Sequence, residues 1–267
     1  HILPSMFFRE LYDPSLAQAS YVIGCQATGE AIVIDPLRDP APYLDVARAE
    51  GLRITHVTET HIHADFVSGA RELRAATGAR LYLSAEGGTD WQYAFAAQDE
   101  AVLLHDGDQI MVGNIQLDVL HTPGHTPACL TYLIGDAAFV GDTLFMPDFG
   151  TARCDFPGGS AQALYDSVHK ILSLPEETRI FVGHDYKAPG RDEYAWETTV
   201  GEQKAKNIHV GAGKSRDEFV QMRETRDATL AMPKLIIPSL QVNMRAGQMP
   251  PADDQGNVYL KVPVNKL

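Results

Sequence analysis

Four short runs of residues that favour β-strands are each followed by a histidine or an aspartate. His61 follows ITHVTET, His125 comes shortly after IQLDVL, Asp142 follows AAFVG and His184 follows IFVG. Loops at the ends of strands are held by a rigid sheet, and a metal site needs that rigidity because ligand distances must hold within about 0.2 Å. The repeated placement predicts a fold in which several strand ends converge on one metal site.

Each of these residues also has an ordinary interpretation. A single histidine is more often a hydrogen-bonded core or surface residue than a metal ligand. Pro123 and Gly124 could simply form a turn before His125, and Asp142 after Gly141 could form an Asx turn. The coincidence of residue type, spacing and strand-end position favours the metal site over these alternatives.

The rest of the chain reads as a mixture of strands and helices. Runs rich in β-branched residues predict strands at Ala31–Ile34, Ile54–Thr60, Ala79–Leu83, Ile115–Leu120, Cys129–Ile134 and Arg179–Val182. Amphipathic patterns predict helices at Pro42–Glu50, Val67–Thr77 and Ser160–Leu174, and a polar helical pattern covers Asp192–Asn207. The dipeptides Gly113-Asn114 and Gly135-Asp136 are hairpin signals, so the strands in the middle of the chain should be antiparallel.

Composition excludes several classes of protein. The chain has 267 residues, 45% of them hydrophobic, which is enough for one large core. Its net charge of −13 offers no basic footprint for a phosphate backbone, so we expect no nucleic-acid partner. No apolar run approaches the roughly 18 residues that a membrane span needs, so we expect a soluble protein with no membrane partner.

The three cysteines indicate a reducing compartment. Cys25, Cys129 and Cys154 are odd in number and scattered, which argues against a disulfide framework and against a thiolate zinc knot. We therefore expect a cytoplasmic protein. Met6 is the expected native start, because no charged and apolar bipartite stretch precedes it.

The order of the motifs resembles the metallo-β-lactamase superfamily. THIHAD, TPGHT, GDTLF and VGHDY are similar, in that order, to the HxHxDH motif of that family and to its later His, Asp and His. The resemblance covers roughly residues 7–200 and implies an α/β fold, the four-layer αββα sandwich, with the metal site at one edge of its two sheets. We expect a catalytic domain over residues 6–200 and an appendage over residues 201–267 that packs on the same domain.

Within the superfamily, three segments are most similar to the persulfide dioxygenase branch. They are TARCDFPGG after GDTLF, the GHDY ending, and PSLQVNMRAG near the C-terminus, which resembles the tail of bacterial members related to rhodanese-fused proteins. The glyoxalase II group shares the fold but has a GHEY-like ending. The resemblance therefore implies oxygen chemistry on a persulfide ahead of hydrolysis.

Phe66 departs from the pattern of the family. In its dinuclear hydrolases a histidine at this position binds a second metal, together with the residues that correspond here to Asp65 and His184. A phenyl ring has no lone pair to give, and two protein ligands make a poor shell for a cation. The resemblance and this departure together predict one metal ion per chain.

The resemblance implies His61, His125 and Asp142 as the ligands of that single metal. Two imidazoles and one carboxylate with open positions form the facial triad of non-haem Fe(II) oxygenases, so Fe(II) is expected, with zinc as a substitute. His63 would lie beside the metal as a hydrogen-bond donor or as an alternative ligand. Asp65 would orient a ligand imidazole.

Two further residues are assigned by resemblance alone. Tyr186 is expected to reach the metal-bound water, and Arg153 is expected to lie near the substrate. Each has an ordinary alternative, because Tyr186 could serve packing and Arg153 could form a surface ion pair.

The function implied is that of an Fe(II)-dependent persulfide dioxygenase, which takes glutathione persulfide and O₂ to sulfite and glutathione. The alternative is a glyoxalase II-like thioester or lactone hydrolase that uses a metal-bound water. A third class, a non-catalytic scaffold with a degenerate site, is disfavoured by the intact triad. The C-terminal appendage could cover the domain or build a dimer face, so a homodimer stays open.

Overall fold

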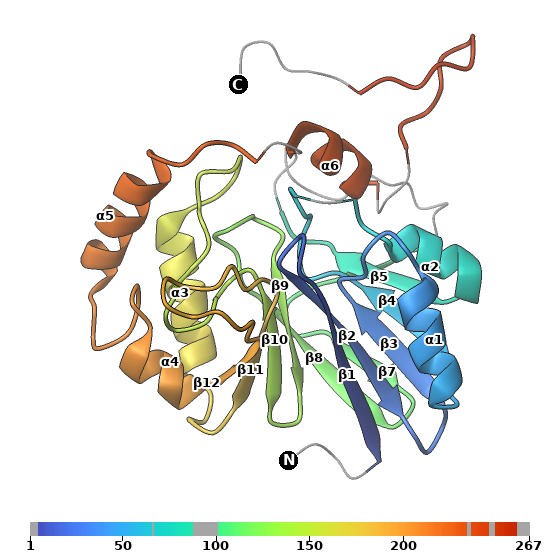
Figure 1. Ribbon diagram of the computed structural model, residues 1–267, viewed down its shortest axis with the longest axis horizontal. Helices are drawn as coiled ribbons and strands as arrows, with labels where there is room; N and C mark the ends of the chain where they lie inside the picture. The colour runs from blue at the N-terminus through green and yellow to red at the C-terminus, as the bar shows by residue number, and fades with distance from the viewer. Residues whose placement is uncertain (1–4, 66, 88–100, 234–235, 246–248, 261–267) are drawn as a thin grey trace.

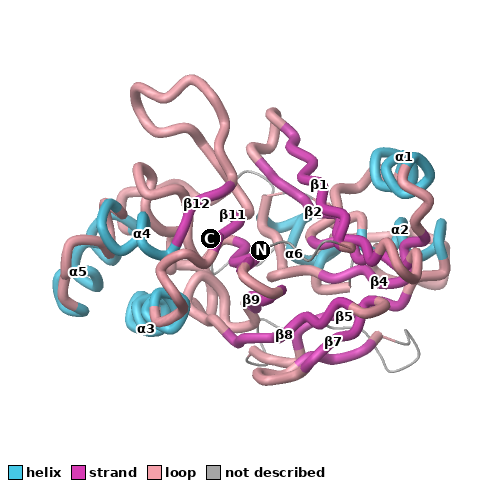
Figure 2. The backbone as a smooth tube through the Cα atoms, turned by 90° about the horizontal axis from the view of Figure 1, so that it is seen from below, coloured by secondary structure: helices cyan, strands magenta, loops and turns pink. Residues whose placement is uncertain are grey.

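The computed structural model describes residues 5–65, 67–87, 101–233, 236–245 and 249–260. These residues form two six-stranded sheets that pack face to face, with helices on the outer face of each sheet, as Figure 1 shows. Seen from below in Figure 2, α1 and α2 lie on one side of the strands, and α3, α4 and α5 lie on the other. The predicted four-layer αββα architecture is confirmed.

The first sheet combines an antiparallel start with a parallel continuation. Its strands, in spatial as well as chain order, are β1 (Met6–Asp13), β2 (Gln18–Cys25), β3 (Glu30–Ile34), β4 (Arg53–Thr58), β5 (Arg80–Ser84) and β6 (Val102–Leu104). From β3 to β6 all pairings are parallel. Parallel neighbours need crossover connections, and the helices α1 (Ala41–Ala49) and α2 (Ala70–Thr77) supply the first two. The carboxyl ends of β3 and β4 therefore lie at the same edge.

The second sheet is antiparallel except for one pair. Its strands, in chain order, are β7 (Gln109–Val112), β8 (Ile115–His121), β9 (Leu130–Ile134), β10 (Ala137–Gly141), β11 (Arg179–Val182) and β12 (Glu197–Thr199). In space they lie in the order β12-β11-β10-β9-β8-β7. Hairpins at Gly113 and Gly135 join β7 to β8 and β9 to β10, as predicted. The parallel pair is β10 and β11, which the helix α3 (Ala161–Leu172) connects. Asp142 and His184 follow these two strands, so the parallel pairing brings them to one edge.

Three clusters of buried side chains separate the four layers. Between the sheets, Ile23 and Ile34 of the first sheet pack with Val119, Tyr132 and Phe139 of the second. A second cluster lies between the first sheet and α1 and α2, and a third lies between the second sheet and α3. Burial of apolar surface is worth about 25 cal/mol per Å², so these interfaces supply the main force that holds the strand ends together.

The helix α3 shows why the sequence predicted this layer. Ser160 caps its N-terminus by accepting a hydrogen bond from the Ala163 amide, and Leu164, Val168 and Ile171 on one face are fully buried. Gly124 packs directly under it, since a Cβ at that position would lie 2.4 Å from the Cα of Leu164. The loop that carries His125 is thereby held against the first turn of the helix.

Two of the expected helices differ from the structure. The helix predicted at Val67–Thr77 begins only at Ala70, because Ser68 forms a β-bridge with Leu37 and Gly69 lies close to the Leu37 carbonyl. The helical pattern at Asp192–Asn207 is wrong for its first half. There the chain forms β12, and the helix α4 (Val200–Lys206) starts after Thr199, whose side chain accepts a hydrogen bond from the Glu202 amide.

The C-terminal part of the chain adds to both outer layers. The helix α5 (Arg216–Asp227) begins at a capping box of Ser215 and Glu218 and buries Phe219 in the cluster around α3. The helix α6 (Ile236–Asn243) contributes Ile236 and Leu240 to the cluster around α2. Among the described residues, no helix is long and apolar enough to cross a bilayer.

Candidate metal centre

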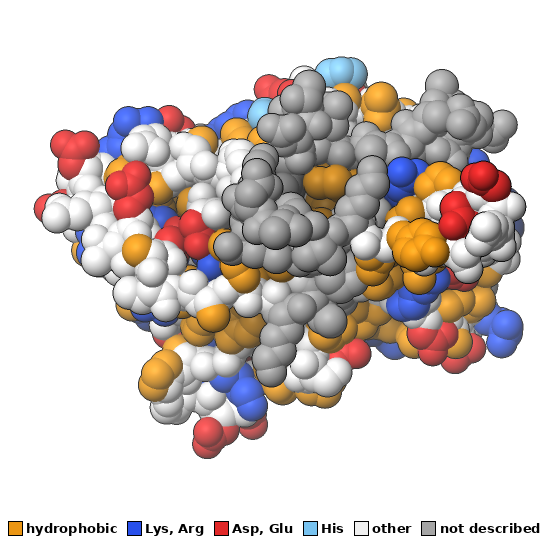
Figure 3. Space-filling model, turned by 90° about the horizontal axis from the view of Figure 1, so that it is seen from above, with side chains coloured by type: hydrophobic (Ala, Val, Ile, Leu, Met, Phe, Trp, Pro, Cys, Tyr) orange, Lys and Arg blue, Asp and Glu red, His pale blue; other side chains and the backbone are white. Residues whose placement is uncertain are grey.

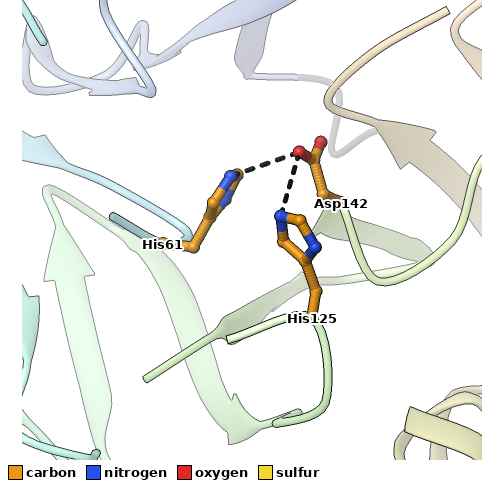
Figure 4. Close-up of side chains that lie close together, drawn as sticks. All are labelled: His61, His125 and Asp142. Carbon is orange, nitrogen blue, oxygen red and sulfur yellow. Dashed lines mark ion pairs between the residues drawn. The ribbon is translucent and has the colours of Figure 1, made fainter. Parts of the chain in front are cut away.

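Three predicted ligands meet at the edge where the two sheets adjoin. The Nε2 atom of His61 lies 3.3 Å from Oδ2 of Asp142, and the Nε2 atom of His125 lies 3.6 Å from the same oxygen. Figure 4 shows both imidazoles turned toward this carboxylate. One ligand atom from each of the three lies within 4.8 Å of the other two, and all three side chains are buried. The structure thus brings together the three residues that the sequence singled out as ligands.

These separations fit a single metal ion. Two ligands that each lie about 2.1 Å from one metal are about 3.0 to 3.5 Å apart when the angle between them is 90 to 110°. The separation of 3.3 Å lies within that range, and the separation of 3.6 Å lies slightly above it, which a somewhat wider angle accommodates. Two nitrogen donors and one oxygen donor suit a first-row transition metal, and three protein ligands leave positions open for exogenous groups.

Each imidazole presents the correct nitrogen to the centre. Nδ1 of His125 lies 2.8 Å from the backbone carbonyl oxygen of Arg153, so it donates its proton there and leaves the Nε2 lone pair free for a metal. Burial lowers the pKa of His125 to about 4, against a smaller opposing effect of Asp142. His125 is therefore neutral near pH 7, as metal ligation requires.

A short chain of hydrogen bonds orients His61. Nδ1 of His61 lies 2.9 Å from the Thr60 hydroxyl, which in turn lies 2.8 Å from Oδ2 of Asp35. The hydroxyl donates to the carboxylate and accepts from the imidazole, which again leaves Nε2 for the metal. Asp35 comes directly after β3 and takes a left-handed backbone conformation, with φ of 56°. It also accepts hydrogen bonds from the Thr60 amide and from Nε2 of His63, at 2.7 and 3.2 Å.

His63 lies next to His61 and outside the candidate ligand set. Its side chain is fully buried, and its ring centroid is 4.1 Å from that of His61. Burial would lower the pKa of His63, but Asp35 outweighs this effect and raises the pKa. The side chain that was expected as a donor or an alternative ligand therefore serves as a donor to Asp35 in this structure.

Asp142 divides its two oxygens between two partners. Oδ1 accepts a hydrogen bond of 2.7 Å from Nδ1 of His184, while Oδ2 faces the two ligand imidazoles. Nε2 of His184 lies 2.8 Å from Oδ2 of Asp65. Burial would lower the pKa of His184, but the two carboxylates outweigh burial and raise the pKa well above its ordinary value. A protonated His184 thus donates to both carboxylates and fixes the orientation of Asp142.

The ligands open into a cavity of about 320 Å³. Its walls include the aromatic side chains of Phe145, Phe149, Phe156 and Tyr186. The ring of Tyr186 stacks on His184, with centroids 5.3 Å apart and an interplanar angle of 7°. This side chain is 46% exposed, so it forms part of the cavity wall without being enclosed in the core.

Arg153 also lines the cavity, but its side chain is engaged. The guanidinium makes two hydrogen bonds of 2.7 Å to the carboxylate of Asp155 and one of 2.8 Å to the carbonyl of Ala231. It also lies over the ring of Phe156, 5.0 Å from the centroid. The clearest contact of Arg153 with the centre is its backbone carbonyl, which holds His125.

The predicted site residues fall into three groups by their location. His61, His125 and Asp142 form the candidate ligand set, His63 and Asp65 bond to residues that orient the ligands, and Tyr186 and Arg153 line the cavity. In particular, Asp65 bonds to His184 and not to an imidazole of the ligand set. Phe66, on which the prediction of a single metal depends, lies outside the described residues.

Sequence reasoning missed several supporting residues. Asp35 directly follows the predicted strand AIVI, so the strand-end rule that selected Asp142 applies to it as well. Asn243 donates to the His63 carbonyl from a position 180 residues away, and the buried pair of Arg223 and Asp227 holds the segment around Arg153. No local pattern in the sequence indicates these long-range contacts.

The fold and the site agree with a known class of proteins. The family model of the metallo-beta-lactamase superfamily matches residues 14–184. The chain therefore belongs to the metallo-β-lactamase superfamily, whose members depend on metal ions.

Individual relatives refine this assignment. A "probable metallo-hydrolase" of Burkholderia pseudomallei is 41% identical, over 96% of this chain and 98% of that protein. The mitochondrial persulfide dioxygenase ETHE1 of Homo sapiens is 32% identical, over 92% of this chain and 91% of that protein. The crystal structure of ETHE1 from Myxococcus xanthus is 37% identical with a TM-score of 0.79, over 91% of this chain and 100% of that chain. The two ETHE1 proteins support the persulfide dioxygenase branch.

Some relatives are longer than this chain. The chain spans 64% of the length of a beta-lactamase hydrolase-like protein of Xylella fastidiosa, to which it is 43% identical over 96% of its own length.

Proposed function

We propose that the protein is a mononuclear Fe(II) persulfide dioxygenase. The observation that carries this proposal is the set of two imidazole nitrogens and one carboxylate oxygen, 3.3 and 3.6 Å apart, that faces an open cavity. The persulfide dioxygenases among the relatives add support. Such a triad leaves adjacent positions free, and a reaction between two exogenous molecules needs those positions.

A single iron per chain is part of the proposal. The chain has Phe66 at the position where dinuclear hydrolases of the superfamily have a histidine that binds a second cation. Asp65 and His184 are engaged with each other at 2.8 Å, and His184 also supports Asp142. In this reading both residues act on the orientation of the ligand carboxylate.

The proposed substrates are glutathione persulfide and O₂. One persulfide, one O₂ and one water give glutathione, sulfite and two protons, so the terminal sulfur is oxidised and O₂ is reduced. Bound ferrous iron would supply a redox centre with room for the persulfide sulfur and for O₂. The protein would hold the peptide part, with Arg226 on the cavity wall as a guanidinium group for its carboxylates. Arg153 lies on the same cavity and would contribute through the side of its guanidinium that Asp155 and Ala231 leave unused.

Tyr186 is the proposed orienting group within the cavity. Its ring stacks on His184, and the side chain lines the cavity into which the candidate ligands open. A phenol can donate or accept a hydrogen bond, which suits a polar group that develops near the metal.

Three free, buried cysteines support a reducing compartment such as the cytoplasm.

A hydrolase is the second candidate, and the 41% identical metallo-hydrolase relative favours it. A thioester or lactone hydrolase would use the same ligands to acidify a water molecule. The absence of a histidine at position 66 weakens this alternative, because many hydrolases of the superfamily use two cations.

One iron-quantified preparation distinguishes the two candidates. Protein from iron-replete medium is assayed for O₂ uptake and sulfite release with glutathione persulfide, and for cleavage of S-lactoylglutathione. We expect one iron per chain, oxygen consumption and little thioester cleavage. Tyr186→Phe should lower oxygen uptake and leave the iron content unchanged. Rapid thioester hydrolysis without oxygen consumption would refute the dioxygenase and support the hydrolase.

A further inference from the structure

The segment that carries His61 is a closed loop. The Ser68 hydroxyl donates a hydrogen bond to the carboxylate of Glu59, which ties Ser68 to the start of the loop formed by residues 59–65. Both side chains are fully buried. His61 and Asp65 lie inside this loop, so its shape sets the distance between a candidate metal ligand and the carboxylate that orients His184.

Asn243, at the end of α6, bridges this loop from one side to the other. Its Nδ2 donates to the backbone carbonyl of His63 at 2.8 Å, and its Oδ1 accepts from the backbone amide of Ser68 at 2.7 Å. The side chain is fully buried. An amide that uses a donor and an acceptor on two points of one loop fixes the separation of those points.

Asp35 holds the same loop at its other side. It accepts from the amide and hydroxyl of Thr60 and from the side chain of His63, as described above. His63 is therefore held twice, through its imidazole by Asp35 and through its carbonyl by Asn243. His61 lies between Thr60 and His63, so these two anchors determine where its ring points.

The helix that supplies Asn243 is itself anchored. Leu240 and Met244 pack against the cluster between the first sheet and α2. The guanidinium of Arg71, on α2, donates to the carbonyl of Arg245 through Nε and Nη2, at 3.2 and 3.1 Å. In Figure 1, α6 lies across one end of the strands, above the ribbon of the first sheet. Its position is thus set by the core of the domain.

We propose that Asn243 is a positioning residue of the metal centre, through which the C-terminal helix fixes the loop that carries His61 and Asp65. The inference rests on the metal site of the proposed function and not on the reaction that the site performs. Residues that orient metal ligands typically change metal affinity by about 10- to 100-fold when they are replaced. We expect a loss of that size without Asn243.

The test compares Asn243→Leu with Val242→Ala. Leucine branches at Cγ as asparagine does, is larger, and makes neither hydrogen bond. Val242, on the same helix, is 2% exposed, so its truncation removes core packing but leaves both hydrogen bonds of Asn243 in place. Zn²⁺ affinity is measured by competition with a chelator, and the absorption spectrum of the Co²⁺ form reports the geometry of the ligands. Hydrogen exchange of the Ser68 amide is followed in metal-free protein.

We expect Asn243→Leu to bind Zn²⁺ about 10- to 100-fold more weakly than the unmodified protein, with an altered Co²⁺ spectrum and faster exchange of the Ser68 amide. Val242→Ala should keep the metal affinity and the spectrum of the unmodified protein, even if it lowers the unfolding midpoint as much as Asn243→Leu does. Equal metal affinity in the two variants would overturn the proposal.

Two further outcomes are separable. If Asn243→Leu does not fold, Asn243→Asp takes its place, because it keeps the acceptor for Ser68 and loses the donor to His63; unchanged Zn²⁺ affinity would then overturn the proposal. If the unmodified protein binds no Zn²⁺, the metal site fails. In that case unchanged exchange of the Ser68 amide in Asn243→Leu would also overturn the role of Asn243 in the loop.

Discussion

The buried ion pair between Arg223 and Asp227 gives a prediction of large effect. Nε and Nη2 of Arg223 lie 2.8 and 2.7 Å from Oδ1 of Asp227, and the two residues are 2% and 5% exposed. The pair also reaches the segment that holds His125. Nη1 of Arg223 donates to the carbonyl of Thr151 at 2.9 Å, and Oδ2 of Asp227 accepts from the amide of Cys154 at 2.8 Å.

The expected loss in the free energy of unfolding depends on which charged group each substitution leaves buried without a partner. Arg223→Met leaves the buried carboxylate of Asp227 uncompensated, and Asp227→Leu leaves the guanidinium uncompensated, so each should lower the free energy of unfolding by about 3 to 5 kcal/mol. The double variant removes both charges. It leaves the Thr151 carbonyl and the Cys154 amide without these partners, at about 1 to 2 kcal/mol each. The double variant should therefore lose about 2 to 4 kcal/mol, well below the sum of the single losses.

Urea unfolding of metal-free protein at pH 7 measures these differences. The exposed pair of Arg216 and Asp166, 3.1 Å apart at 49% and 63% side-chain exposure, serves as the control because it also involves an arginine of α5. Arg216→Met should leave the unfolding midpoint nearly unchanged, since solvent screens an exposed pair. If the losses of the two single variants simply add in the double variant, the pair is not coupled and the reasoning is refuted.

Two further predictions concern pH and the fit around Asp142. Burial and the nearby Arg223 lower the pKa of His209 to about 4, below its ordinary value of 6.5, so the unfolded chain binds more protons between these values and stability falls as the pH is lowered through that range. The variant His209→Asn can keep an acceptor for the Thr151 amide. Between pH 7 and pH 5 its free energy of unfolding, measured with urea, should fall by about 1 to 2 kcal/mol less than that of the unmodified protein. Equal decreases would contradict the assignment. A Cβ at Gly183 would lie 2.8 Å from Oδ1 of Asp142, so Gly183→Ala should displace this carboxylate and weaken Zn²⁺ binding by about 10-fold in a chelator competition, whereas unchanged affinity would show that the site adapts.

The parts of the fold that sequence patterns predicted are those with a local signal. The hairpins at Gly113 and Gly135 need a left-handed residue, and both glycines have positive φ. Ser160 caps α3 as expected. In contrast, β1 and β2 were not predicted. The first is half-buried along nearly its whole length and the second is fully buried, so neither shows the alternation that marks a strand with one wet face.

The candidate ligands could be predicted for a similar reason. His61, His125 and Asp142 follow β4, β8 and β10, and the strand-end rule placed them at one site together with His184. The family resemblance then separated the three candidate ligands from His184. The supporting contacts depend on tertiary structure. The carbonyl that holds His125 belongs to Arg153, 28 residues away, and no residue type is needed to supply a carbonyl. The acceptor beside His63 is Asp35, whose role depends on a left-handed backbone conformation.

The described surface in Figure 3 offers an anion no broad positive field. Seen from above in Figure 3, the face on the side of α6 carries acidic and basic side chains among apolar ones, and no broad basic patch covers its described part. The net charge of −13 points in the same direction. Recognition of a small anionic substrate would then depend on individual guanidinium groups at the cavity and not on long-range attraction.

The contact between Asn243 and His63 has a consequence for the order of events during synthesis. A chain emerges from the ribosome from its N-terminus, and this hydrogen bond joins residues 180 positions apart. At about 5 to 20 residues per second, His61 and its loop are outside the ribosome for roughly 10 to 40 seconds before Asn243 appears. All three candidate ligands are translated about 100 residues before Asn243, and until then the loop lacks its C-terminal anchor. If Asn243 positions the metal centre as proposed, tight capture of a metal ion would be a late step in the maturation of the protein.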